Sequence, residues 1–130
     1  RGLPAEDASA WMLGRLTGPA HALDLIVSGR VFLAEEAAEL GVVQRLSEPG
    51  QVLDDAVAYA RAVAENVSPV SMAMMKSQVW HDLDCTMDAA RIRAQHLLTL
   101  AKGLPDFTEG VNALVEKRAP NFEPYSRVVF

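Results

Sequence analysis

Glu6 is the residue whose type and position most clearly suggest a chemical role. It lies in a stretch of small and apolar residues between Pro4 and Trp11. A carboxylate in apolar surroundings is costly unless it has a partner or a task, and one such task is to take up and return a proton. Acidic residues are also favoured in the first turn of a helix, so Glu6 and Asp7 could simply complement a helix dipole. The residues alone leave both interpretations open.

Lys117 and Arg118 are adjacent cations at the end of a predicted helix. Two cations at that place could hold a phosphate group through charge-assisted hydrogen bonds. Cations also complement the negative end of a helix dipole and need no ligand to explain them. The pair therefore marks either an anion site or an ordinary helix end.

The other reactive residue types show no spacing typical of a site. The histidines and the single cysteine are His21, His81, His96 and Cys85. This scatter predicts no metal site, and one cysteine cannot form an internal disulfide. The methionines around Met74 lie at helical spacing, which is more typical of core packing than of a cofactor site.

Composition excludes two classes of partner. The 130 residues include 12 Lys and Arg against 17 Asp and Glu, a net charge of −5, and no basic run stands out, so we expect no nucleic-acid binding. No apolar run approaches the roughly 20 residues of a membrane span, and no secretion signal opens the chain, so we expect a cytoplasmic protein. The length suits one domain, and the start at Arg1 suggests a processed or truncated chain.

Helices must position these candidates, because helical signals dominate the chain. The predicted helices span 5–16, 19–27, 34–40, 52–65, 70–83, 86–102 and 107–117. Pro4 suits a first helical turn, and Ser68 suits an N-cap with Pro69 behind it. Residues 42–46 are predicted to form a short strand or extended segment. A turn divides the chain near Pro49.

Four segments in order carry a family resemblance. They are RGLPAEDASAWMLGRLTG, ALDLIVSGRVFLAEEAAELGVVQRL, ENVSPVSMAMMK and DFTEGVNALVEKRAPNF. Together they resemble the C-terminal half of the crotonase superfamily, the enoyl-CoA hydratase/isomerase family. The resemblance implies a mainly α chain that forms the C-terminal helical part of a crotonase-type α/β spiral fold. Residues 1–48 would end the spiral core and line the pocket, and residues 49–130 would form a helical oligomerisation region.

The resemblance also implies an activity and a site. It implies a lyase or isomerase acting on acyl-CoA thioesters in fatty-acid metabolism, such as beta-oxidation, assembled as a homotrimer or hexamer. No cofactor or metal is expected, since coenzyme A (CoA) is part of the substrate. Glu6 matches the glutamate of the isomerases, and Lys117 and Arg118 match a helix that meets the CoA of a neighbouring subunit. The family's N-terminal half supplies the oxyanion hole, so this chain alone is expected to be inactive.

Three positions depart from the family pattern. Ala8 stands where glycine is usual, Gly14 where proline is common, and Leu114 where an aromatic residue often occurs. These departures put ordinary hydratase geometry in doubt. The alternative to an enzyme is a non-catalytic helical assembly module, whose carboxylates are surface caps and whose apolar helix faces are subunit contacts.

Overall fold

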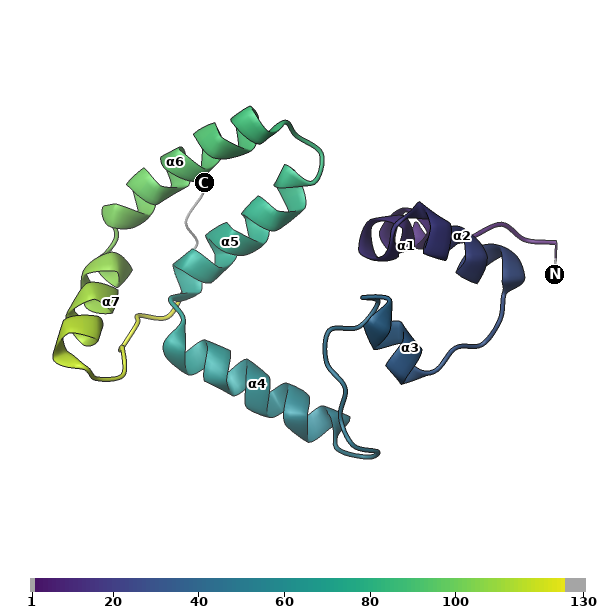
Figure 1. Cartoon of the computed structure of the whole chain (residues 1–130). Coiled ribbons are helices and arrows are strands. Elements are labelled where there is room, and N and C mark those ends of the chain that lie inside the picture. The colour runs from purple at the N-terminus through teal and green to yellow at the C-terminus, as the bar shows by residue number, and fades with distance from the viewer. Residues whose placement is uncertain (1, 126–130) are drawn as a thin grey trace. The chain divides into compact units, whose positions relative to one another are not determined.

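The computed structural model describes residues 2–125, and every regular element in that range is a helix (Figure 1). The helices are α1 (Ser9–Thr17), α2 (Pro19–Ser28), α3 (Ala34–Glu39), α4 (Val52–Asn66), α5 (Pro69–Asp82), α6 (Met87–Lys102) and α7 (Pro105–Glu116). The mainly α prediction is confirmed. The chain forms two compact units, residues 1–55 and 56–130, whose boundary lies inside α4.

The first unit is built around the contact between α1 and α2. Gly41 follows α3 with a φ of +78°, and a Cβ there would lie 3.3 Å from the backbone oxygen of Leu16. Only glycine permits both this conformation and this close approach at no steric cost. Arg30 then pairs with Asp24 of α2 and Glu36 of α3, which ties the two helices across their extended link. The hydrogen bond from Arg30 lowers the pKa of the Glu36 carboxyl.

Two predicted elements of this unit differ from the structure. The first helix begins at Ser9, not at residue 5, because Asp7 and Ala8 have φ values of +49° and +59°, which no α-helix contains. The expected strand at 42–46 is absent from the described residues. Instead, the Val42 and Val43 amides donate to the Ala37 carbonyl at 2.8 and 3.2 Å, which leaves them unavailable to a strand partner.

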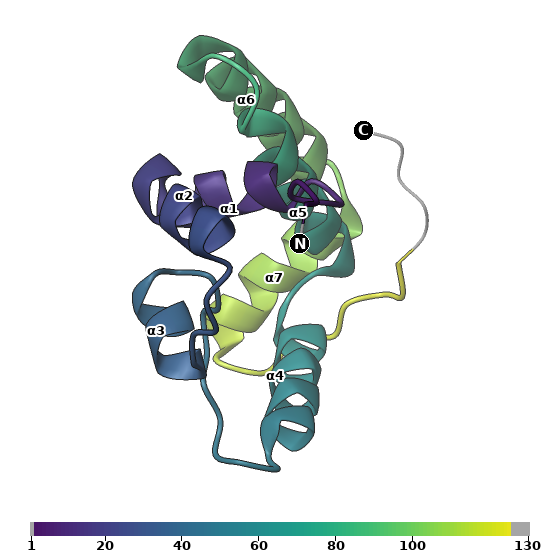
Figure 2. The same cartoon turned by 90° about the vertical axis from the view of Figure 1, so that its right-hand side faces the viewer.

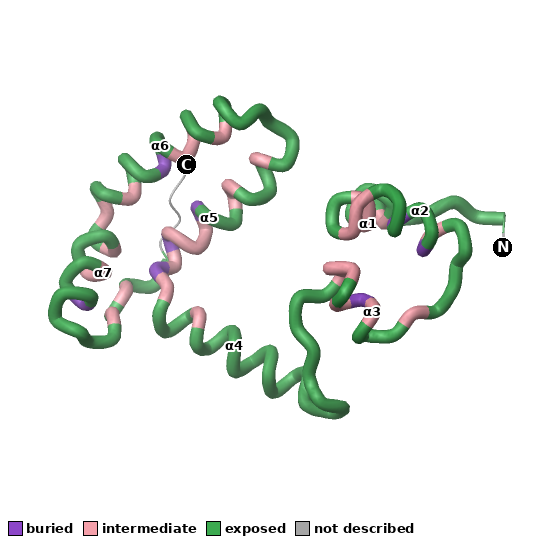
Figure 3. The backbone as a smooth tube through the Cα atoms, in the orientation of Figure 1, coloured by how far each residue is buried: buried purple, intermediate pink, exposed green. Residues whose placement is uncertain are grey.

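The second unit contains the hydrophobic core of the helical region. Helices α5 and α6 lie side by side in Figures 1 and 2, and α6 also contacts α7. Val70 and Met74 of α5 pack against Leu97 of α6, with Ala101 and Leu104 at the edge of the cluster. Figure 3 shows how few positions of the described chain are buried. The core role predicted for the methionines is confirmed for Met74, whereas Met75 and the neighbouring Trp80 are 48% and 49% exposed, so for them the prediction is wrong.

Ser68 joins the beginnings of two helices in this unit. Its Oγ accepts a hydrogen bond from the Ser71 amide at 3.1 Å, which caps α5 as the sequence predicts. The same hydroxyl donates a short hydrogen bond to the Asp106 carboxylate in the first turn of α7. Ser68 is the one buried polar residue in the described part of the chain, and both its donor and its acceptor are used.

Large apolar side chains remain exposed on α4 and α7. Helix α4 buries none of its residues, although Val52 and Leu53 lie in its first turn. On α7, Leu114 and Val115 are 80% and 75% exposed. Exposed apolar side chains of this size are typical of surfaces that contact another polypeptide or a ligand.

Ser68→Ala is expected to lower the free energy of unfolding by about 2–3 kcal/mol, because it removes a helix cap and a hydrogen bond to a carboxylate together. Thr86→Ala is the matched control. Thr86 caps α6 through the Ala89 amide and makes no second bond, so its loss should cost about 1 kcal/mol. Urea unfolding of both variants measures the difference, and equal losses would show that the bond to Asp106 contributes nothing.

Candidate functional site

Glu6 lies on an exposed turn just before α1. Its backbone carbonyl accepts from the Ser9 amide at 2.9 Å, while Ala8 holds the N-cap position in a left-handed conformation. The residue was expected within a buried first turn, and both parts of that expectation are wrong. Helix α1 has no acidic residue in its first turn. Glu6 therefore does not have the first-turn position from which a carboxylate complements the helix dipole.

Lys117 ends α7 in a left-handed conformation, with φ of +55° and ψ of +43°. The Arg118 amide donates to the Ala113 carbonyl at 3.1 Å, and the Lys117 amide donates to the Leu114 carbonyl at 3.4 Å. These two bonds form a Schellman motif, in which the left-handed position is usually glycine. The helix end predicted at Lys117 and Arg118 is therefore confirmed. Lysine is an unusual residue at its left-handed position.

The Arg118 guanidinium is bound by protein carboxylates. Its Nη1 and Nη2 donate to the two Glu109 oxygens at 2.6 and 3.0 Å, and its Nε donates to Glu116 at 2.6 Å. Glu109 also accepts from the Asn121 amide at 2.6 Å. The Arg118 hydrogen bond, followed by the Asn121 amide, lowers the pKa of Glu109 to about 2, so this carboxylate stays charged at neutral pH.

The two candidate regions belong to different units, with Glu6 in residues 1–55 and the cations in residues 56–130. Within residues 2–125, no three His, Cys, Asp or Glu side chains gather as metal ligands do. Among the same residues, no helix has the length and hydropathy to cross a bilayer.

Comparison with known proteins identifies the family. The sequence pattern described as enoyl-CoA hydratase/isomerase matches residues 2–125. The chain belongs to the enoyl-CoA hydratase/isomerase family. It is 32% identical over 124 residues to the enoyl-CoA hydratase ACTT3 of Alternaria alternata, a match that covers 95% of this chain and 42% of that protein. The chain thus spans less than half the length of the curated relatives it matches.

Solved structures of the family align with nearly the whole chain. The enoyl-CoA hydratase of Mycobacterium tuberculosis H37Rv aligns with a TM-score of 0.88 and 30% identity, over 95% of this chain and 48% of that one. The enoyl-CoA hydratase EchA1 of Mycobacterium marinum aligns with a TM-score of 0.86 and 31% identity, over 94% and 48%. This confirms the assignment to the C-terminal helical part of a crotonase-type fold.

Membership of the enoyl-CoA hydratase/isomerase family gives a reason for the unusual turn beside Glu6. The sequence resemblance matches Ala8 to a position where glycine is usual, and its φ of +59° is a conformation that glycine adopts freely. A non-glycine residue there costs of order 1 kcal/mol or more. The substitution therefore keeps the backbone path of the turn at the expense of stability.

Sequence reasoning missed the partners of Arg118. The DFTEG and EKR motifs that carry the family resemblance contain Glu109, Glu116 and Arg118. Their alternation of acidic and basic residues could have suggested an ion-pair network. Glu109 and Arg118 are nine positions apart, which exceeds the i to i+4 spacing by which helical pairs are recognised, so the sequence pattern did not reveal the contact.

Ala8→Gly is expected to raise the free energy of unfolding by about 0.5–1 kcal/mol, because glycine relieves the left-handed strain. The gain is not larger because glycine also loses more backbone entropy on folding. Ala10→Gly, two residues further on in regular α1, is the control and should lower stability. Denaturant unfolding distinguishes them. If both variants lost stability alike, the turn would not be strained.

Proposed function

We propose that this chain forms the C-terminal portion of an enzyme that acts on acyl-CoA thioesters, with double-bond isomerisation favoured over hydration. The observation that carries the proposal is the position of Glu6. Glu6 is exposed just before α1 in a member of the family, and the sequence resemblance matches it to the glutamate of the isomerases. Hydration usually needs a second carboxylate to share the water, and the proposal requires only one.

A single carboxylate can perform this isomerisation. Glu6 would take a proton from C2 of a 3-enoyl-CoA, and the C–H electron pair would pass into the thioester as an enolate. The protonated Glu6 would then return the proton to C4, as the double bond moves from C3–C4 to C2–C3. The enolate requires hydrogen-bond donors at its oxygen, and the family resemblance assigns these to the N-terminal half.

Lys117 is proposed as the cation that contacts a CoA phosphate. Its ammonium makes no ion pair with any residue in 2–125, whereas the Arg118 donors are bound to Glu109 and Glu116. Direct CoA binding by Arg118 stays a prediction, and its hydrogen bonds to Glu109 and Glu116 favour a supporting role. No cofactor is proposed beyond the CoA of the substrate.

The proposed assembly is a homotrimer or hexamer in the cytoplasm, with a role in fatty-acid metabolism such as beta-oxidation. The exposed apolar residues of α4 and α7 support a role in assembly, because such faces need cover from another polypeptide. The same exposed faces favour the second candidate function, a non-catalytic assembly module. Activity that depends on Glu6 distinguishes the two.

Glu6→Gln in the full-length protein is expected to lower turnover of a 3-enoyl-CoA about a hundredfold or more, because the amide keeps the size of the side chain but cannot accept the proton. Steady-state kinetics measures the loss, and circular dichroism checks that the fold is kept. Asp7→Asn, the neighbouring carboxylate, is the control and should leave turnover unchanged. Full turnover in Glu6→Gln would contradict the catalytic role.

The 130-residue chain by itself is expected to show no hydratase or isomerase activity and to self-associate. The family resemblance assigns the donors that stabilise the enolate to an N-terminal half, and the described helices α4 and α7 expose apolar side chains. Enzyme assays with 2-enoyl-CoA and 3-enoyl-CoA test the first point, and sedimentation velocity tests the second. Measurable activity, or a clean monomer, would contradict the respective expectation.

A further inference from the structure

The conformation of Lys117 is strained, and the helix end gains nothing from it. A Schellman motif needs only a left-handed backbone at this position, which glycine provides without steric cost. Lysine there, at φ of +55°, carries the cost of a left-handed non-glycine residue. A side chain kept at a costly backbone position is a sign that the side chain itself has a use.

Glu109 holds the chain on both sides of this turn. Its carboxylate accepts two hydrogen bonds from Arg118, directly after Lys117, and one from the Asn121 amide. It is the more shielded of the two carboxylates on Arg118, with 23% of its side chain exposed against 58% for Glu116. The segment that follows therefore folds back on α7 instead of leaving the helix axis.

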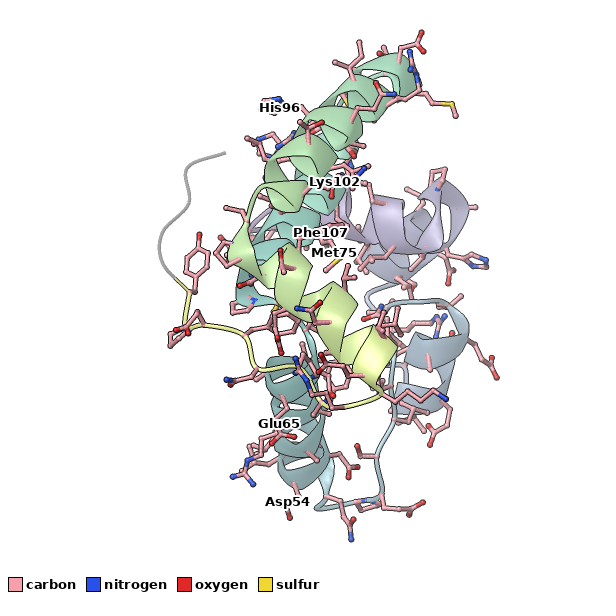
Figure 4. The ribbon with its side chains drawn as sticks, turned by 90° about the vertical axis from the view of Figure 1, so that its left-hand side faces the viewer. Asp54, Glu65, Met75, His96, Lys102 and Phe107 are labelled. Carbon is pink, nitrogen blue, oxygen red and sulfur yellow. The ribbon has the colours of Figure 1, made fainter. Side chains whose placement is uncertain are left out.

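Further contacts keep this return path in place. The Phe122 ring packs over Gly110, where a Cβ would lie 3.9 Å from the ring carbons. Residues 119–124 then line a hollow together with residues 64–66 and Pro69. In Figure 4 the first turn of α7 is marked by Phe107, and the tail runs back beside that helix.

We propose that Glu109 is a positioning residue for Lys117: by binding Arg118 and the Asn121 amide, it fixes the left-handed turn that aims the Lys117 ammonium at a CoA phosphate. This inference rests on the proposed function, in which Lys117 contacts CoA. Glu109 itself does not touch the ligand. Its contribution is to remove the conformational freedom that binding would otherwise have to remove.

The test is a double-mutant cycle on CoA affinity, measured by titration calorimetry with coenzyme A as the probe and the full-length protein. Lys117→Ala should weaken binding about tenfold, and more at low salt than at high salt, because a charge-assisted hydrogen bond is lost. Glu109→Ala should weaken it about three- to tenfold, and should have no further effect when Lys117 is already alanine. Glu109→Gln keeps one acceptor oxygen and replaces the other with an amide donor, so its affinity should fall between that of the parent protein and that of Glu109→Ala.

Two matched variants separate positioning from general stability. Lys117→Gly should lose affinity as Lys117→Ala does, yet melt at an unchanged or higher temperature, because the strain is relieved. Glu116→Ala removes the other carboxylate on Arg118 and should leave CoA affinity within about twofold of the parent protein, since Glu109 still holds the turn.

The outcomes are distinct. Unchanged affinity in Lys117→Ala would reject the proposed CoA contact, and with it the positioning role. A loss in Glu109→Ala that persists undiminished in the Lys117→Ala background would reject the positioning role alone and leave the CoA contact standing. No loss in Glu109→Ala or Glu109→Gln would also overturn the inference.

Discussion

The hydroxyl of Ser68 is the point on which the helical region depends. It accepts from the Ser71 amide and donates to the Asp106 carboxylate, so one buried side chain sets where α5 begins and where α7 begins. Helix α6 lies between them in the sequence and contacts both. Fixing where α5 and α7 begin limits how the helices that carry Val70, Met74 and Leu97 can shift against one another. This apolar cluster is small for a region of this length. A small core gains much from a polar anchor whose donor and acceptor are both used.

Helix α7 carries a second anchor, Glu109, one turn after Asp106. Asp106 and Glu109 stand three residues apart, so they share a face of α7, and each binds a group from a distant part of the chain. Asp106 fixes the helix to the beginning of α5, and Glu109 fixes the returning tail. The position of Lys117 follows from both bonds, because the first sets the helix and the second sets the turn at its end.

Strain accompanies both candidate functional residues. Ala8 and Lys117 adopt left-handed conformations that glycine would adopt freely, the first two residues after Glu6 and the second at the proposed CoA contact itself. Unfavourable backbone conformations persist where the surrounding structure holds them. At Lys117 that support is visible in the Glu109 and Arg118 bonds, and at Ala8 it includes the bond between the Glu6 carbonyl and the Ser9 amide.

The sequence by itself determined the helical class, the limits of most helices, the Ser68 cap and the family, because periodicity, capping residues and collinear motifs are local signals. Only the tertiary structure decided where α1 begins, which carbonyl the amides at 42–43 bind and which carboxylates the Arg118 guanidinium binds. The pattern around Pro4 predicted a helix start that the left-handed Asp7 and Ala8 prevent. The Ser68–Asp106 and Glu109–Arg118 bonds join residues 38 and 9 positions apart. Contacts at such separations depend on how helices pack, and local spacing does not encode that.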